Sequence, residues 1–218
     1  GVSPRPFVSC LCPTYRRPQM MANTIPCFIT QDYPADRREL IILDDAGELK
    51  NETGERWQII SIPRRFRSLP EKFNALAGLA QGEILVVWED DDLYLQHHIS
   101  THVRAMEGRL WSKPSSVLST YTGKHEVEDA TGRFHASLAF RREVFDRIGG
   151  WPLAKRGDFD QQQIARLTAI GAPSDPCQLD SPPWIFGLSQ ANGYHGQALM
   201  QGPEDEGWCE RVAGGQAQ

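Results

Sequence analysis

The sequence lacks several features that would assign a function directly. Its five cysteines include no Cys-x-x-Cys pair, so a zinc ribbon and a disulfide framework are both disfavoured. No apolar run approaches the roughly 20 residues that a membrane-spanning helix needs. No Gly-x-Gly-x-x-Gly follows the first apolar segment, which argues against an oxidoreductase of the Rossmann type.

The chain also lacks an excess of positive charge. Lys and Arg number 23 against 28 Asp and Glu, and the formal net charge is −5. A nucleic-acid binder would need a basic field, so that class is disfavoured. A nucleotide ligand remains possible because a bound metal ion can supply positive charge locally. With no signal-peptide pattern at the start, we expect a cytoplasmic protein with reduced thiols.

The first half of the sequence alternates between apolar strands and helical patterns. Strands are expected at 7–12, 39–43, 57–62 and 84–88, and helices at 18–31, 70–81 and 96–107, with Pro26 kinking or shortening the first helix. The strands are apolar on both faces, as in a parallel sheet that is covered by helices. The sequence therefore predicts an α/β fold with a Rossmann-like, mostly parallel sheet.

The second half is less regular, and we expect a mixed arrangement there. Strands are expected at 115–121 and 134–140, and helices at 141–148 and 159–170. From about residue 173 onward, Pro, Gly, Ser and Gln dominate. With 218 residues, one domain over 1–218 is the simplest organisation, ending in a tail at 201–218.

Acidic clusters follow two of the expected strands. Asp44 and Asp45 come after 39–43, and four acids at 89–92 (EDDD) come directly after ILVVW. The carboxyl ends of parallel strands meet at one edge of a sheet, where ligands bind. Crowded carboxylates raise one another's pKa unless a cation is near, and Mg²⁺ or Mn²⁺ prefers such oxygen ligands. The alternative is that these acids only cap the following helix.

Several segments, in order, resemble the family 2 glycosyltransferases. These are VSCLCPTYRRP at the first strand, QDYP, ELIILDDAG, EILVVWEDDDLY with its DxD-type motif, SLAFRREVFDRIGGW, and GDFD. They cover roughly residues 7–170. The resemblance implies the GT-A fold and an inverting transfer of sugar from a nucleotide-sugar donor. It also implies a nucleotide-sugar-binding half at 7–95 and an acceptor and catalytic-base half at 96–200.

The resemblance implies a set of donor-binding residues. Tyr15 is expected near the base, and Asp45 would hydrogen-bond the base or ribose with support from Asp44. A core aromatic and a simple turn are the alternative readings of Tyr15 and of the Asp pair. Arg65 or Arg67 is expected to face the phosphates, unless both are solvated. The assigned set is Pro13, Thr14, Tyr15, Asp44, Asp45, Arg67 and Asp90.

The DxD-type motif implies the metal ligands. Glu89 and Asp91 occupy its two acid positions, with Asp91 as the direct ligand of Mn²⁺ or Mg²⁺. Glu89 replaces the usual Asp, and Asp92 is either a further ligand or a helix cap. His195 lies in a Gly-flanked segment of the kind from which GT-A enzymes often supply a histidine to the metal or diphosphate. The alternative is an ordinary surface histidine.

Inverting transfer needs one general base, and the resemblance assigns it to Asp158. The Glu that usually precedes this residue is replaced by Gly157, which departs from the family pattern. Asp160 is the second candidate. The alternative reading is that Asp158 caps the helix at 159–170.

Other residues have two readings each. His98 and His102 share one helix face, which suits zinc, but no third ligand is evident and we expect them at the surface. Trp151 and Trp184 either stack on sugars or pack in the core. Cys10 and Cys12 point to one face of the first strand and are expected to be core thiols.

The sequence thus predicts a glycosyltransferase that moves a sugar from a UDP-, GDP- or dTDP-sugar to a hydroxyl of a glycan, a lipid-linked sugar or another acceptor. A nucleotidyltransferase that makes sugar nucleotides is one rival, although CPTYRRP lacks the glycines of its phosphate loop. A non-catalytic nucleotide-sugar-binding domain is the other, and Gly157 favours it.

Overall fold

The computed structural model describes residues 4–119, 126–153 and 158–186. Over these residues the main element is a seven-stranded sheet in the order β3-β4-β2-β1-β5-β10-β7. Its strands are β1 (Val8–Thr14), β2 (Arg38–Asp44), β3 (Glu52–Thr53), β4 (Trp57–Ser61), β5 (Ile84–Val87), β7 (Trp111–Ser112) and β10 (Ala139–Arg141). The four central strands β4, β2, β1 and β5 are parallel, and β3, β10 and β7 pair antiparallel at the edges.

The strand order creates a switch point between β1 and β5. From β1 the chain moves outward through β2 to β4, and then returns to the other side of β1 as β5. Thr14 at the end of β1 is level with Asp44 at the end of β2. In open α/β sheets a ligand crevice forms where the order reverses, outside the carboxyl ends of the strands. The residues after β1 and β5 are therefore the candidates for a ligand-binding site.

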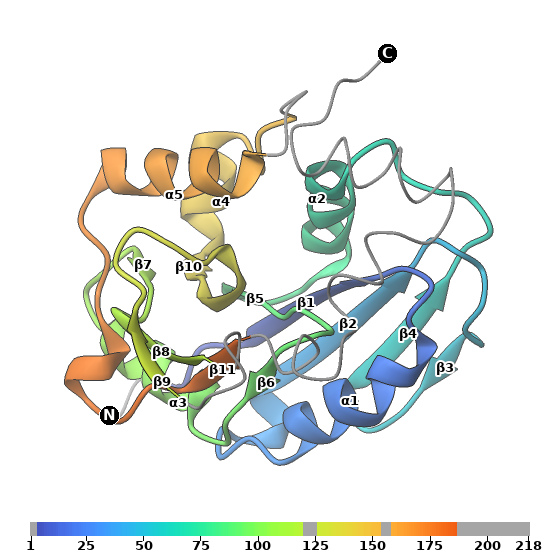
Figure 1. Ribbon diagram of the computed structural model, residues 1–218, viewed down its shortest axis with the longest axis horizontal. Helices are drawn as coiled ribbons and strands as arrows, with labels where there is room; N and C mark the ends of the chain where they lie inside the picture. Colours follow the sequence, from blue (N-terminus) through green and yellow to red (C-terminus); the bar gives the residue numbers. More distant parts are fainter. Residues whose placement is uncertain (1–3, 120–125, 154–157, 187–218) are drawn as a thin grey trace.

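Helices cover both faces of this sheet (Figure 1). One face packs against α1 (Met21–Ile29) and α3 (His98–Ala105), and the other against α2 (Leu69–Leu79), α4 (Arg142–Ile148) and α5 (Phe159–Ile170). Alternate β1 residues divide between the two faces, with Cys10 and Cys12 towards α1 and Leu11 towards α2. Both thiols are free and fully buried, as expected of core cysteines.

A second sheet lies beside the first one, in the order β6-β11-β8-β9 among the described residues. Its strands are β6 (Leu93–Tyr94), β8 (Ser116–Ser119), β9 (Glu126–Asp129) and β11 (Trp184–Phe186). Short 3₁₀ turns at Pro18–Met20, Ala35–Arg37, His135–Ser137 and Pro176–Gln178 connect the elements. The α/β fold with a largely parallel sheet and flanking helices is confirmed.

Several local predictions need correction. The strand expected at 134–140 is a 3₁₀ turn followed by the short antiparallel β10, because Phe134 takes a positive φ of 63° that ends any extended run. The helix expected at 96–107 is shorter than predicted and covers only α3, His98–Ala105. The helix expected at 18–31 is a 3₁₀ turn and then α1, which ends three residues after Pro26.

The histidines on α3 were expected at the surface and are buried instead. The ring centres of His98 and His102 are 4.6 Å apart. His98 packs edge-on against Trp88 and Tyr94, and Nδ1 of His102 lies 2.8 Å from the Ser112 hydroxyl. Trp151 and Trp184 are also buried, which favours the core reading for both. None of the helices in the described part of the chain has the length and apolar character that crossing a bilayer requires.

Gly82 gives a test of the packing between β1 and β5. A Cβ at this position would lie 2.6 Å from the backbone nitrogen of Ser9 and 2.8 Å from the carbonyl oxygen of Ile84. We predict that Gly82→Ala lowers the free energy of unfolding by about 1–3 kcal/mol, because β1 must move. Gly78→Ala is the matched control, since nothing lies within 4 Å there. Urea denaturation that finds the two variants equally stable would contradict this packing.

Candidate active site

The segment after β1 carries the first group of predicted site residues. Pro13 and Thr14 are buried at the strand end, and Tyr15 is partly buried. The guanidinium carbon of Arg65 lies 3.6 Å from the centre of the Tyr15 ring, so the two side chains stack. Arg67, the residue assigned to the phosphates, is exposed. Of the two candidate arginines, Arg65 is therefore the one held at the end of β1.

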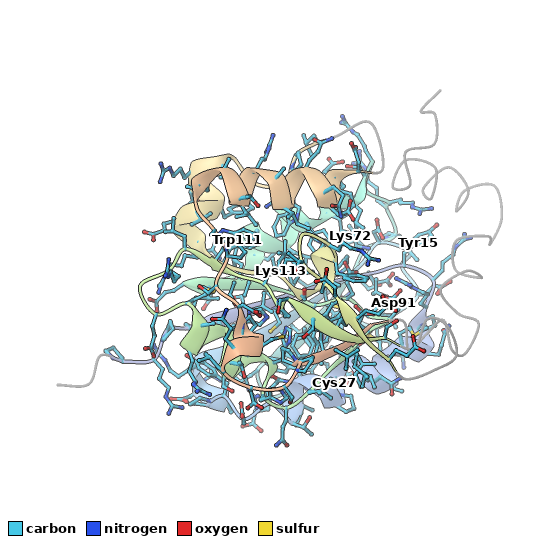
Figure 2. The ribbon with its side chains drawn as sticks, turned by 60° about the vertical axis from the view of Figure 1, so that its left-hand side comes forward. Tyr15, Cys27, Lys72, Asp91, Trp111 and Lys113 are labelled. Atoms are coloured by element: carbon cyan, nitrogen blue, oxygen red, sulfur yellow. The ribbon has the colours of Figure 1, made fainter. Side chains whose placement is uncertain are left out.

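The two acids after β2 have different structural partners. Asp44 accepts hydrogen bonds from the backbone N–H groups of Ala46, Glu48 and Leu49 and from the Ser61 hydroxyl. The Asp44 carboxylate therefore stabilises the turn after β2, which agrees with the alternative reading of the Asp pair as turn residues. Asp45, the second acid, forms an ion pair with Lys72. Figure 2 shows Lys72 on the same side of the molecule as Tyr15 and Asp91.

Asp45 belongs to a buried ion pair. Its Oδ1 lies 2.5 Å from Nζ of Lys72, and its Oδ2 accepts from the backbone N–H of Phe66. Lys72 also donates to the carbonyl of Thr14. Burial lowers the pKa of Lys72, and the charge of Asp45 opposes that shift. The pair ties the ends of β1 and β2 to α2, and the predicted contact of Asp45 with a base or ribose stays a prediction.

The acidic run after β5 lies beside the end of β1, across the switch point. The Thr14 hydroxyl donates to Oδ2 of Asp90 over 2.7 Å. Arg17 lies 2.6 Å from Oδ1 of Asp90 and 3.1 Å from Oδ2 of Asp91. Asp90, Asp91 and Asp92 are all buried, and Glu89 is partly buried. The end of β1 and the acidic run after β5 thus meet at the switch point, and the charges of Asp45 and Asp90 both act on Lys72.

The charge balance of this run is tight. Burial and the neighbouring Asp91 and Asp90 raise the pKa of Glu89 to about 8. Burial also raises the pKa of Asp90, although Arg17 acts in the opposite direction. For Arg17 itself, burial favours the neutral form, but Asp90 and Asp91 outweigh it and raise the pKa. Burial and the adjacent aspartates therefore favour the protonated form of Glu89, and further positive charge would favour the carboxylate.

The chemistry of these donors fits a hard divalent cation. Carboxylate oxygens are the ligands that Mg²⁺ and Mn²⁺ prefer, and the raised pKa of Glu89 marks a group short of positive charge. Within residues 4–119, 126–153 and 158–186, no three His, Cys, Asp or Glu side chains are already grouped as a metal site. Arg17 occupies the position between Asp90 and Asp91, and the third predicted ligand, His195, lies outside the described residues.

The start of α5 also lies near this run. Phe159 packs against Phe73 of α2, with ring centres 6.4 Å apart. Asp160 is one of the charges that raise the pKa of Glu89. Asp158 is exposed and is the N-cap residue of α5, as the alternative reading had it. Its side chain accepts from the Gln162 amide and makes no capping hydrogen bond to a backbone N–H of the first turn.

One residue of this region escaped the sequence analysis. His135 is buried, and its Nδ1 lies 3.9 Å from Oε1 of Glu89. Burial lowers the pKa of His135 to about 3, so the ring is neutral and the contact is not an ion pair. His135 lay inside the strand expected at 134–140, two residues before the SLAFRREVFDRIGGW segment, and no motif recognised above includes it.

Known structures share this fold. The mannosyltransferase PcManGT from Pyrobaculum calidifontis, solved with GDP-Man and Mn²⁺, aligns with a TM-score of 0.63 at 18% identity over 96% of this chain and 70% of its own. S. aureus TarS aligns with a TM-score of 0.64 at 11% identity over 82% of this chain. The TarS 1–349 structure with UDP-GlcNAc gives 0.55 at 12% identity over 74%.

These alignments establish the fold alone, because sequence identities of 11–18% do not show a shared function. The matched region is 36% of the TarS chain and 53% of TarS 1–349. No protein-family model matches the sequence, and no curated protein is significantly similar to it. The chain has a fold that a mannosyltransferase also has, and membership of family 2 stays a prediction.

Arg17 is the residue to remove in a test of this charge arrangement. We predict that Arg17→Ala lowers the free energy of unfolding by about 3 kcal/mol, since buried carboxylates lose their cation. Mn²⁺ should restore more stability to this variant than to the wild type. Arg147→Ala, an exposed arginine on α4, should change stability by less than about 0.5 kcal/mol. Thermal denaturation with and without Mn²⁺ measures both, and a variant indifferent to Mn²⁺ would count against the cation site.

Proposed function

We propose that the protein is a glycosyltransferase that moves a sugar from a nucleoside-diphosphate donor to a hydroxyl acceptor, with inversion and with the help of Mn²⁺ or Mg²⁺. One observation carries the proposal. The carboxylates after β5 gather at the β1–β5 switch point, in a fold shared with a mannosyltransferase that was solved with GDP-Man and Mn²⁺. A UDP-, GDP- or dTDP-sugar is the proposed donor.

The end of β1 suits a nucleoside diphosphate. The stack of Tyr15 and Arg65 offers a flat face for a base and a positive charge for phosphates. The Lys72–Asp45 pair fixes the wall behind Thr14. Arg65 is better placed than Arg67 for the phosphates, because it is held against Tyr15 while Arg67 is exposed.

Glu89 and Asp91 would hold the metal ion, with His195 as the proposed third ligand. When bound, the ion supplies positive charge to the diphosphate that leaves. Asp90, bonded to Thr14 and Arg17, would keep the acidic run in register with β1. With an ion held by Asp91, Arg17 would no longer pair with Asp91, and its guanidinium would be available to bind the diphosphate.

Asp158 is the proposed general base. It would take the proton of the acceptor hydroxyl while that oxygen forms its bond to the anomeric carbon and the bond from that carbon to the diphosphate breaks. Two features support a base at the start of α5. Phe159 fixes this end of the helix against Phe73, and Asp160 is close enough for its charge to act on Glu89.

Thermal-shift measurements test the nucleotide and metal site together. We predict that GDP, UDP or dTDP stabilises the protein when Mn²⁺ is present, because a ligand that binds only the folded state raises its stability. Asp91→Asn should abolish the metal-dependent part of that shift, whereas Asp146→Asn, an exposed carboxylate on α4, should leave it intact. An unchanged shift in Asp91→Asn would mean that the metal is bound elsewhere or not at all.

Turnover separates the base from the binding site. We predict that Asp158→Asn lowers transfer by about 10²–10⁴-fold, the usual contribution of a general base, with near-normal nucleotide affinity. Release of nucleoside diphosphate from a donor and acceptor panel is the measurement. Full activity in Asp158→Asn with loss in Asp160→Asn would move the base to Asp160. Binding without turnover in the wild type would identify a non-catalytic domain.

A further inference from the structure

His135, which lies close to Glu89, follows a residue with an unusual backbone conformation, Phe134. Phe134 has φ 63° and ψ 89°, a backbone conformation that residues other than glycine rarely adopt. Such a conformation persists where the surrounding structure enforces it. The 3₁₀ turn His135–Ser137 follows at once and carries the histidine into the interior. The strain at Phe134 thus has a visible result, the position of His135.

Aromatic side chains surround the His135 ring. The ring centres of Phe73, Phe159 and Trp151 lie 5.1, 5.4 and 5.9 Å from it, all in edge-on arrangements. Phe73 comes from α2, Phe159 from the start of α5, and Trp151 from the segment after α4. Three separate elements therefore hold the imidazole in one orientation.

The hydrogen bond with Trp151 fixes the tautomer of His135. Nε1–H of the indole donates to Nε2 of the imidazole over 2.6 Å. An indole nitrogen only donates, so Nε2 must be the acceptor. In a neutral imidazole the single proton then resides on Nδ1. Nδ1 is the atom that faces Oε1 of Glu89 at 3.9 Å. That gap is longer than a direct hydrogen bond, and a bridging water or a small rotation of Glu89 would close it.

The same turn also holds the backbone of Glu89. The Glu89 N–H donates to the Tyr94 hydroxyl over 2.8 Å, and this hydroxyl donates to the carbonyl of Ala136 over 2.9 Å. The main chain and the side chain of Glu89 thus both face one turn, through Ala136 and His135.

We propose that His135 is a positioning residue, which orients the Glu89 carboxylate through Nδ1–H while Trp151 keeps the proton on that nitrogen. The inference rests on the proposed function, because Glu89 matters as a metal ligand. Partners of this kind orient metal ligands, and their loss typically costs about 10–100-fold in metal affinity. The effect should therefore be seen in Mn²⁺ binding itself, independently of turnover.

Mn²⁺ affinity with saturating GDP or UDP is the measurement, made by titration calorimetry or from the electron paramagnetic resonance signal of free Mn²⁺. We expect His135→Leu to weaken Mn²⁺ binding by about tenfold or more. His135→Asn should stay within about threefold of the wild type, because its amide N–H can replace Nδ1–H. Trp151→Phe keeps an aromatic ring but removes the hydrogen bond that holds the His135 proton on Nδ1. It should weaken Mn²⁺ binding by about three- to tenfold.

Trp111→Phe is the matched control, because the buried Trp111 indole also donates one hydrogen bond, to the carbonyl of Gly171. It should leave Mn²⁺ affinity unchanged. Equal affinity in the wild type, His135→Leu and Trp151→Phe, with a clear loss in Glu89→Gln, would overturn the role of His135 and leave the metal site standing. A wild type that binds no Mn²⁺ with either nucleotide would overturn the proposed function and this inference together.

Discussion

Buried negative charge at the end of β5 is the constraint on which the rest of the site depends. Three aspartates, Asp90, Asp91 and Asp92, are almost without solvent contact and follow one strand directly. Arg17 offsets part of that charge by lying between Asp90 and Asp91. Burial and then the charges of Asp91 and Asp90 still raise the pKa of Glu89, against the effect of Arg17. A divalent cation would complete the charge balance, which is why the metal is central to the proposed function.

Much of the fold could be predicted from the sequence, because the signals were local. The runs 39–43 and 84–88 are apolar on both faces and became central parallel strands. The helix at 159–170 is found at the predicted bounds. The parallel sheet then placed the ends of β1, β2 and β5 at one edge, so the meeting of Thr14 with Asp90 followed from topology rather than from any single motif.

The partners of the acids could not be predicted, because they depend on tertiary contacts. Nothing in the sequence near Asp45 indicates that Lys72, 27 residues away, would bury its charge beside it. The contact between His135 and Glu89 depends on the positive φ of Phe134, and a propensity argument assigns a phenylalanine there to a strand. His98 and His102 were misplaced for a similar reason, since Trp88 and Tyr94 pack against His98 in the interior, and His98 and Ser112 contact His102.

Anomalous diffraction at the manganese edge, from crystals grown with Mn²⁺ and GDP or UDP, tests the central claim most directly. The account predicts one strong peak within coordination distance of carboxylate oxygens of Glu89 and Asp91, with the Arg17 guanidinium no longer between Asp90 and Asp91. A nucleotide bound at the β1–β5 crevice with no manganese peak, and with Arg17 still bridging the two aspartates, would contradict it.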